Sequence, residues 1–173
     1  MLGIPFVVRI ADIDETMDPS LPASQEVARL SREKARAIPR DPDDVVVAAD
    51  TVVVLENRVL GKPRDQEDAR RMLRMLSGRV HQVMTGVTVL CGDEELTHTE
   101  ITDVKFRDLT EREIEAYIAT GEPMDKAGAY GIQLRGGLFV EMVHGDYFSV
   151  VGLPMCRLEQ MLRQAAPKLM GDM

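Results

Sequence analysis

A chain of 173 residues, 45% of them hydrophobic, can bury one sizeable core, so we expect a single domain over residues 1–173. Its formal net charge of -8 excludes a nucleic-acid polymer as the main partner, because a phosphate backbone requires a basic face, but it does not exclude a nucleotide. The chain has only two cysteines, far apart in the sequence, so we expect no disulfide framework and favour a cytoplasmic protein. No apolar stretch approaches the roughly 18 residues of a membrane span, so we expect no membrane partner.

The chain opens with Leu2-Gly3-Ile4-Pro5, a pattern typical of a helix end, although no helix precedes it. Two interpretations stay open at this point: the chain begins partway through a fold, or it has an ordinary terminus. We predict a strand over residues 6–10 and a loop over residues 11–16.

The next predicted element is a helix over residues 20–38, with Val27, Leu30 and Ile38 on one side at helical spacing. Lys34 lies in the same apolar stripe, whereas the other charged residues, including Glu26 and Arg29, mostly lie on the opposite side. The amine of Lys34 must therefore extend into solvent or reach a buried anion, and the pattern alone favours solvent.

The strongest strand signal is the apolar run over residues 45–49, which ends on Asp50 and Thr51. Such a run is typical of a central strand buried on both faces. Ligands of open α/β sheets gather at the carboxyl ends of these strands, so Asp50 is the first catalytic candidate. A purely structural role for Asp50, in a turn or an ion pair, is equally consistent with this strand taken alone.

The rest of the chain alternates turns, strands and helices, with a glycine-rich segment over residues 121–137 that indicates a backbone close to a ligand. The predicted elements are a turn at Gly61-Lys62-Pro63, a helix that Asp65 caps and Gly78 ends, strands over residues 80–90 and 101–106, a helix opened by a capping box of Thr110 and Glu113, strands over residues 138–143 and 148–151, and a last helix from Pro154.

Carboxylates recur at the predicted strand ends and turns, namely Asp12, Asp14, Glu15, Asp50 and Asp146. Their hard oxygen ligands suit magnesium or manganese better than zinc. The histidines at positions 81, 98 and 144 have no ligand spacing, so structural or exposed positions are expected for them. Carboxylates, a metal and lysine together favour phosphoryl transfer or phosphoanhydride hydrolysis.

A series of motifs in chain order closely resembles the Maf family. The motifs are Ala49-Asp50-Thr51-Val52-Val53, Gly61-Lys62-Pro63, Leu76-Ser77-Gly78-Arg79, Thr85-Gly86-Val87, Gly121-Glu122-Pro123, the run from Asp125 to Gln133, and His144-Gly145-Asp146-Tyr147. Each motif is weak alone, and their joint order carries the resemblance. It implies a single-domain α/β fold of the Maf/ITPase-like type, in which helices flank an elongated mixed sheet.

The resemblance also implies a house-cleaning nucleoside triphosphate pyrophosphatase, often a homodimer, that requires a divalent cation, Mg²⁺ or Mn²⁺. Carried over by motif, Asp50 would accept the proton of the attacking water and would share the metal with Glu15. Lys34 and Lys62 would bind the triphosphate as point charges, which reverses the solvent interpretation of Lys34.

Thr51 and Gln133 match the family positions tied to substrate choice and resemble its dTTP/UTP branch. The physical chemistry agrees, because a Gln amide offers a donor and an acceptor that can pair with O4 and N3–H of uracil or thymine. The expected substrates are therefore dTTP, UTP and modified pyrimidine nucleotides.

One departure from the family pattern concerns the start: the opening strand and a Ser-x-Ser-Pro-Arg-Arg loop should precede Leu2 and are absent from this sequence. We therefore expect a domain that is truncated at its N-terminus, and an inactive or regulatory Maf-derived binding protein stays open as an alternative. A second alternative is a haloacid-dehalogenase-type phosphatase with Asp12 as nucleophile, because residues 12–16 fit Asp-x-Asp-x-Thr.

Overall fold

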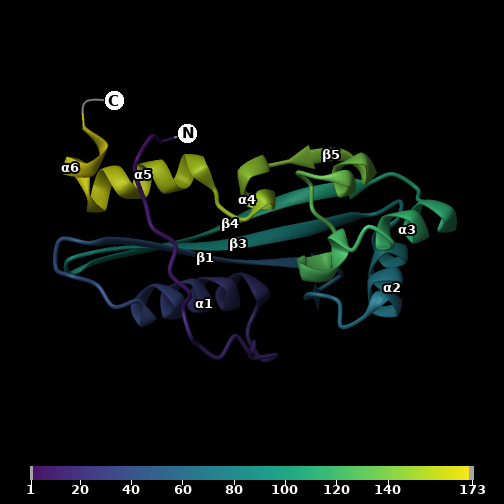
Figure 1. The fold of residues 1–173 in the computed structure, drawn as a ribbon, viewed down its shortest axis with the longest axis horizontal. Helices are drawn as coiled ribbons and strands as arrows, with labels where there is room; N and C mark the ends of the chain where they lie inside the picture. Colours follow the sequence, from purple (N-terminus) through teal and green to yellow (C-terminus); the bar gives the residue numbers. More distant parts are fainter. Residues whose placement is uncertain (1, 172–173) are drawn as a thin grey trace.

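The computed structural model describes residues 2–171, which form one long sheet with helices on both faces (Figure 1). Its strands are β1 (Val45–Leu55), β2 (Arg58–Leu60), β3 (Val80–Cys91), β4 (Glu94–Phe106) and β5 (Val140–His144), in the spatial order β2-β1-β3-β4-β5. The predicted α/β fold, an elongated sheet flanked by helices, is confirmed. Every strand pair within the described residues is antiparallel, so the sheet is not mixed in strand direction as expected.

The helices divide between the faces and one end of the sheet. Helix α1 (Ala23–Ala37) covers one face and α5 (Met155–Ala165) the other, while α2 (Gln66–Leu76) and α3 (Glu111–Ile118) pack together at the far end of the long axis (Figure 1). The short elements are α4 (Tyr147–Val151), α6 (Pro167–Met170) and three 3₁₀ turns, η1 (Glu122–Asp125), η2 (Ala127–Ala129) and η3 (Arg135–Phe139). None of the helices in residues 2–171 combines the length and the apolar character that a membrane span requires.

The hydrophobic core extends along the sheet in three clusters. Leu73, Phe106 and Ile114 belong to the largest, between α2, α3 and the sheet. The second joins β3 to α5, and the third lies between α1 and the strands β1 and β3, where Val27 is fully buried. Each buried leucine or phenylalanine stabilises the fold by roughly 1.5–3 kcal/mol relative to exposure, so both faces of the sheet are firmly covered.

Local helix signals are confirmed. Asp65 N-caps α2 and accepts a hydrogen bond from Asp68 N at 2.8 Å, and Thr110 and Glu113 form the capping box of α3. The first predicted helix occupies Ala23–Ala37 and the last begins directly after Pro154.

Two predicted strands are wrong. Residues 6–10 form no strand, and Phe6, Val7, Val8 and Ile10 are 78% to 93% exposed; no other described segment pairs with their backbone. Residues 148–151 belong to helix α4, because the Asp146 side chain accepts a hydrogen bond from Phe148 N at 2.7 Å and caps the turn. This cap overrides the strand preference of the aromatic and β-branched residues.

The position of Asp50 also differs from the prediction. Strand β1 does not end there but continues to Leu55, and Asp50 pairs with Gly86 in the middle of the antiparallel register with β3. The fully buried half of β1 is Val52 to Leu55, whereas the half before Asp50 is only partly buried. The strand-end argument for Asp50 as a catalytic residue therefore does not hold.

Candidate active site

Asp50 contacts Lys34, which lies on α1, the helix that covers the same face of the sheet. Lys34 Nζ, on α1, donates a hydrogen bond to Asp50 Oδ1 at 2.7 Å and lies 3.1 Å from Glu15 Oε1. The side chains of Lys34 and Asp50 are only 18% and 11% exposed. Lys34 therefore reaches a partly buried anion, and the fold brings three of the predicted site residues together.

Gly86 permits the close approach of α1 on which this contact depends. A Cβ atom on Gly86 would lie 2.2 Å from the carbonyl oxygen of Val27, so only glycine lets the helix backbone come so near. Lys34 follows Val27 by two helical turns, and Gly86 is the cross-strand partner of Asp50. The glycine thus sets the distance between the lysine and the carboxylate.

A buried carboxylate attaches the Glu15 loop to the same helix. Glu26 is fully buried and accepts hydrogen bonds from Asp18 N at 2.7 Å and from the Arg29 guanidinium, which in turn donates to the Thr16 carbonyl at 2.9 Å. The sequence pattern grouped Glu26 with the charges opposite the apolar stripe, and it did not indicate that the preceding loop buries this side chain. The Arg29 hydrogen bond holds the pKa of Glu26 below its usual range, so the charge persists and fixes the loop next to Lys34.

The surroundings raise the pKa of both members of the Lys34 and Asp50 pair. For Asp50, burial raises the pKa, and the hydrogen bond and charge of Lys34 offset this only in part. For Lys34, burial lowers the pKa, but the hydrogen bonds and charges of Asp50 and Glu15 outweigh it. Lys34 therefore stays protonated, and Asp50 is a stronger base than an exposed aspartate.

On the other face of β1 lies a cavity of about 260 Å³. Its lining includes the polar or charged residues Thr51, Lys62, Asp125, Lys126 and Gln133. Apolar residues of β1, β3, α4 and the segment from Ala127 to Leu134 also line it. Thr51 Oγ1 hydrogen-bonds to Thr85 Oγ1 at 2.9 Å. The volume is near the lower end of the roughly 300–1,000 Å³ of small-molecule sites.

The edge of the sheet at β1 connects the Lys34 and Asp50 pair on one face with the cavity on the other face. Asp50 and Thr51 are neighbours in a strand, so their side chains point to opposite faces. On this edge, and within the described residues, β1 pairs only with β2 and only from Val53 onward, so its backbone edge is open at Asp50. A ligand at this edge can contact both faces at once.

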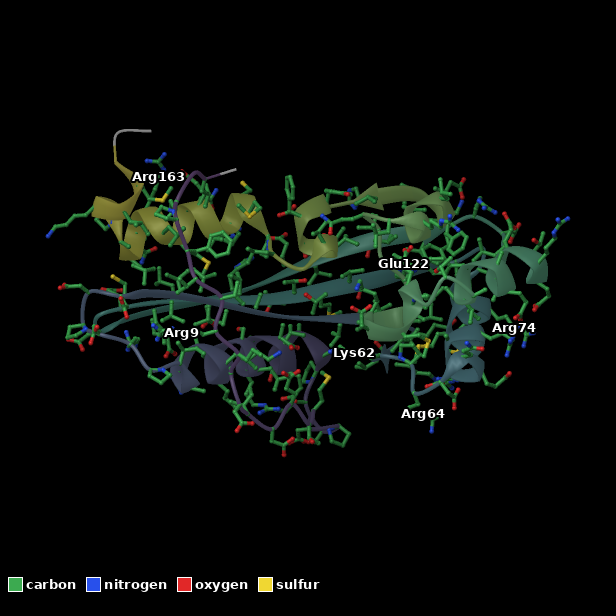
Figure 2. All side chains as sticks on the ribbon, in the orientation of Figure 1. Arg9, Lys62, Arg64, Arg74, Glu122 and Arg163 are labelled. Carbon is green, nitrogen blue, oxygen red and sulfur yellow. The ribbon has the colours of Figure 1, made fainter. Side chains whose placement is uncertain are left out.

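Lys62 lies two residues after the end of β2, in the stretch between α1 and α2 in the view of Figure 2. The pKa of Asp50 is raised by burial, and the charge of Lys62 is one of the effects that oppose this rise. The pKa of Asp125 is lowered by the Lys126 hydrogen bond and, to a smaller extent, by the charge of Lys62. Lys62 is therefore within electrostatic reach of both faces. Within the described part of the chain it forms no ion pair, which leaves its charge available to an anion.

Glu15 and Asp50 are the residues that fit a divalent cation. Within residues 2–171 no three His, Cys, Asp or Glu side chains converge as a metal site. Magnesium in nucleotide enzymes, however, is usually held by one or two carboxylates together with substrate phosphates. Both carboxylates contact the same Lys34 ammonium group, so a divalent cation held by the two would lie beside that ammonium and not at its position.

Two other residues considered in the sequence analysis, His81 and Asp12, lie outside the candidate site. His81 is buried, its Nε2 lies 2.8 Å from Tyr130 Oη, and burial lowers its pKa to about 4, as expected for a structural histidine. Asp12 is exposed, and residues 2–11 form no strand that could lead into the nucleophile loop of a haloacid-dehalogenase-type phosphatase. The sequence analysis missed Asp125 and Lys126 as lining residues, and their position inside the motif ending at Gln133 was the available signal.

Comparison with known proteins identifies relatives of this chain. A family model described as "Maf-like protein" matches residues 1–165. A dTTP/UTP pyrophosphatase of Bacillus cereus (strain ZK / E33L) is 46% identical over 165 residues, which are 95% of this chain and 86% of the relative. The dTTP/UTP pyrophosphatases of Bacillus thuringiensis subsp. konkukian (strain 97-27) and Bacillus anthracis are 45% identical with the same coverage.

The matched region contains the α1 helix with Lys34, the β1 strand with Asp50 and the loop with Gln133, so the similarity and the geometry concern the same residues. Neither the haloacid-dehalogenase alternative nor a purely regulatory binding protein has support in these comparisons. The chain belongs to the Maf family.

Proposed function

We propose that this protein is a nucleoside triphosphate pyrophosphatase that hydrolyses dTTP and UTP to the monophosphate and pyrophosphate. The observation that carries the proposal is the arrangement around the open edge of β1: a partly buried carboxylate paired with lysine on one face, and a cavity lined in part by Gln133 on the other. The names of the Bacillus relatives support this substrate class.

The triphosphate extends over the strand edge, where Lys34 and Lys62 bind its oxygens as point charges. The formal charges of Glu15, Lys34, Asp50 and Lys62 cancel, so these residues alone do not neutralise the substrate. A divalent cation, Mg²⁺ or Mn²⁺, would be held by Glu15 and Asp50, and would supply the missing positive charge and polarise the phosphoryl oxygens.

Asp50 is the proton acceptor for the attacking water. As the new bond to phosphorus forms, the anhydride bond between the α and β phosphates breaks, pyrophosphate leaves, and the water proton passes to Asp50. Lys34 remains protonated and keeps the carboxylate in place through its 2.7 Å hydrogen bond. The raised pKa of Asp50 makes this transfer easier than it would be at an exposed aspartate.

Gln133 hydrogen-bonds to the base, and Thr51 lines the same cavity. The amide group donates to O4 and accepts from N3–H of thymine or uracil. Modified pyrimidines that keep these two positions fit the same pattern, which is consistent with removal of non-canonical nucleotides. By resemblance to the family we also propose a homodimer, which light scattering tests directly.

The test compares Asp50→Asn with Asp12→Asn. With dTTP and Mg²⁺, Asp50→Asn should release pyrophosphate on the order of 10²-fold more slowly with an unchanged melting temperature, because the amide cannot accept the proton. Asp12→Asn, the same change on an exposed loop, should keep wild-type rates. Retained activity in a folded Asp50→Asn protein refutes the mechanism, and loss of activity in Asp12→Asn with release of phosphate from monoesters favours the phosphatase.

A further inference from the structure

The loop that carries Gln133, residues 131–136, has its backbone held from outside by two side chains. Gly131 N donates a hydrogen bond to Tyr117 Oη at 3.1 Å. Arg135 N and Gly136 N donate to the two carboxylate oxygens of Glu122, at 3.2 and 3.1 Å. These bonds lie on both sides of Gln133 and therefore restrict where its amide can point.

The two anchoring side chains are themselves connected. Tyr117 Oη donates to Glu122 Oε1 at 2.7 Å, and the tyrosine ring is buried against Phe139 with 5.0 Å between ring centroids. Burial, and then the Glu122 hydrogen bond, raise the pKa of Tyr117, so its hydroxyl stays protonated and remains a donor. We call this pair the Tyr117–Glu122 clamp.

The chemistry of the clamp requires a carboxylate at position 122. Glu122 accepts from three donors, the Tyr117 hydroxyl and two backbone N–H groups, and a carboxylate is the side chain that offers only acceptors. A glutamine in its place turns an N–H group toward one of these donors. The glutamate lies at the end of the molecule that contains α2 and α3 (Figure 2).

The loop lies against the clamp without free space. A Cβ atom on Gly136 would be 2.7 Å from Tyr117 Oη and 2.8 Å from the Gly131 carbonyl oxygen. The loop therefore cannot shift toward Tyr117, and the hydrogen bonds prevent it from moving away. Neither Tyr117 nor Glu122 lines the cavity, so any effect they have on the base acts through this loop.

We propose that Tyr117 and Glu122 are positioning residues that set base selectivity by fixing the Gln133 loop. This inference rests on the proposed function, in which Gln133 contacts the base. Cytosine presents a donor where thymine presents an acceptor, so discrimination between them requires a Gln133 amide held in one orientation. A loosened loop lets the amide turn and lowers that discrimination.

The experiment uses Tyr117→Phe and Glu122→Gln, with Glu113→Gln as the matched control. Glu113 undergoes the same change in the same region, but its partners are Arg107 and Thr110 rather than the loop. Hydrogen exchange of peptides covering residues 131–136 measures the clamp, and kcat/KM for dTTP and dCTP measures selectivity. Because Tyr117→Phe keeps the ring and its packing, it carries the test if Glu122→Gln does not fold.

We expect both variants to accelerate amide exchange in the loop and to lower the dTTP to dCTP ratio of kcat/KM about 10-fold, mainly through a higher KM for dTTP. The control should match wild type in both measurements. Unchanged exchange refutes the clamp, and faster exchange with an unchanged ratio refutes its role in selectivity. A wild-type protein that releases pyrophosphate from neither nucleotide refutes the proposed function itself, and with it this inference.

Discussion

Replacing Gly86 by alanine tests whether the spacing between α1 and the sheet sets the Lys34 and Asp50 contact. The new Cβ atom would lie 2.2 Å from the Val27 carbonyl oxygen, 2.4 Å from its carbon and 2.8 Å from Ala28 N. All three are backbone atoms of a helix, so no side-chain rotation relieves the overlap. Since nonbonded heavy atoms prefer separations near 3.5 Å, α1 must withdraw by about 1 Å.

This withdrawal affects stability and activity by different amounts. Overpacking of this kind costs about 1–3 kcal/mol, which for a chain of this length lowers the melting temperature by about 3–10 °C. Because Lys34 moves with α1, its 2.7 Å hydrogen bond to Asp50 lengthens by about as much as the helix is displaced. A displacement near 1 Å at a catalytic group lowers kcat/KM by on the order of 10²-fold.

Thermal melting and pyrophosphate release from dTTP measure the two effects. Gly61→Ala is the stability control, because a methyl group at Gly61 has no heavy atom within 4 Å. We expect Gly61→Ala to melt near the wild-type temperature and Gly86→Ala well below it. If Gly86→Ala melts within 1 °C of wild type and hydrolyses dTTP at the same rate, α1 is not held at the distance described and the argument for Gly86 is wrong.

Two further predictions concern His81 and Gln133. Burial lowers the pKa of His81 from 6.5 to about 4, so the unfolded chain binds a proton that the folded chain excludes. The free energy of unfolding should therefore fall by about 1.5 kcal/mol from pH 6.5 to pH 5. Urea unfolding of His81→Gln should lack this part of the pH dependence, and an equal pH dependence in both proteins contradicts the assignment. Gln133→Glu replaces a donor with an acceptor and should lower kcat/KM for dTTP and UTP relative to CTP, whereas unchanged relative rates remove Gln133 from base recognition.

The sequence predicted best those features that short-range chemistry determines. The Asp65 cap and the capping box of Thr110 and Glu113 involve residues three apart, so their geometry follows from local spacing. Lys34 is an intermediate case. Its helical spacing indicated which side of α1 it occupies, but only the packing of α1 on β1 identified Asp50 as its partner.

Features that depend on distant partners could not be predicted in the same way. An apolar run over residues 6–10 resembles a strand, but strand formation needs a neighbour, and no described segment provides one. The burial of Glu26 depends on Arg29 and the loop before α1, and helical spacing alone placed it in solvent. The link between Tyr117 and the loop spans 14 residues, with no periodic signal in the sequence.

The short β2 strand explains how one site uses both faces of β1. If β2 continued its pairing beyond Val53, it would cover the strand edge at Asp50 and separate the two faces. Instead the chain turns away at Gly61, whose carbonyl oxygen accepts a hydrogen bond from Gly128 N at 3.1 Å. Gly128 has φ 67° and leaves no room for a Cβ atom against Val53, which fixes the glycine-rich segment to the strand. This connection leaves the edge open, brings Lys62 to it and places the cavity wall beside it, so the site's geometry depends on where β2 stops.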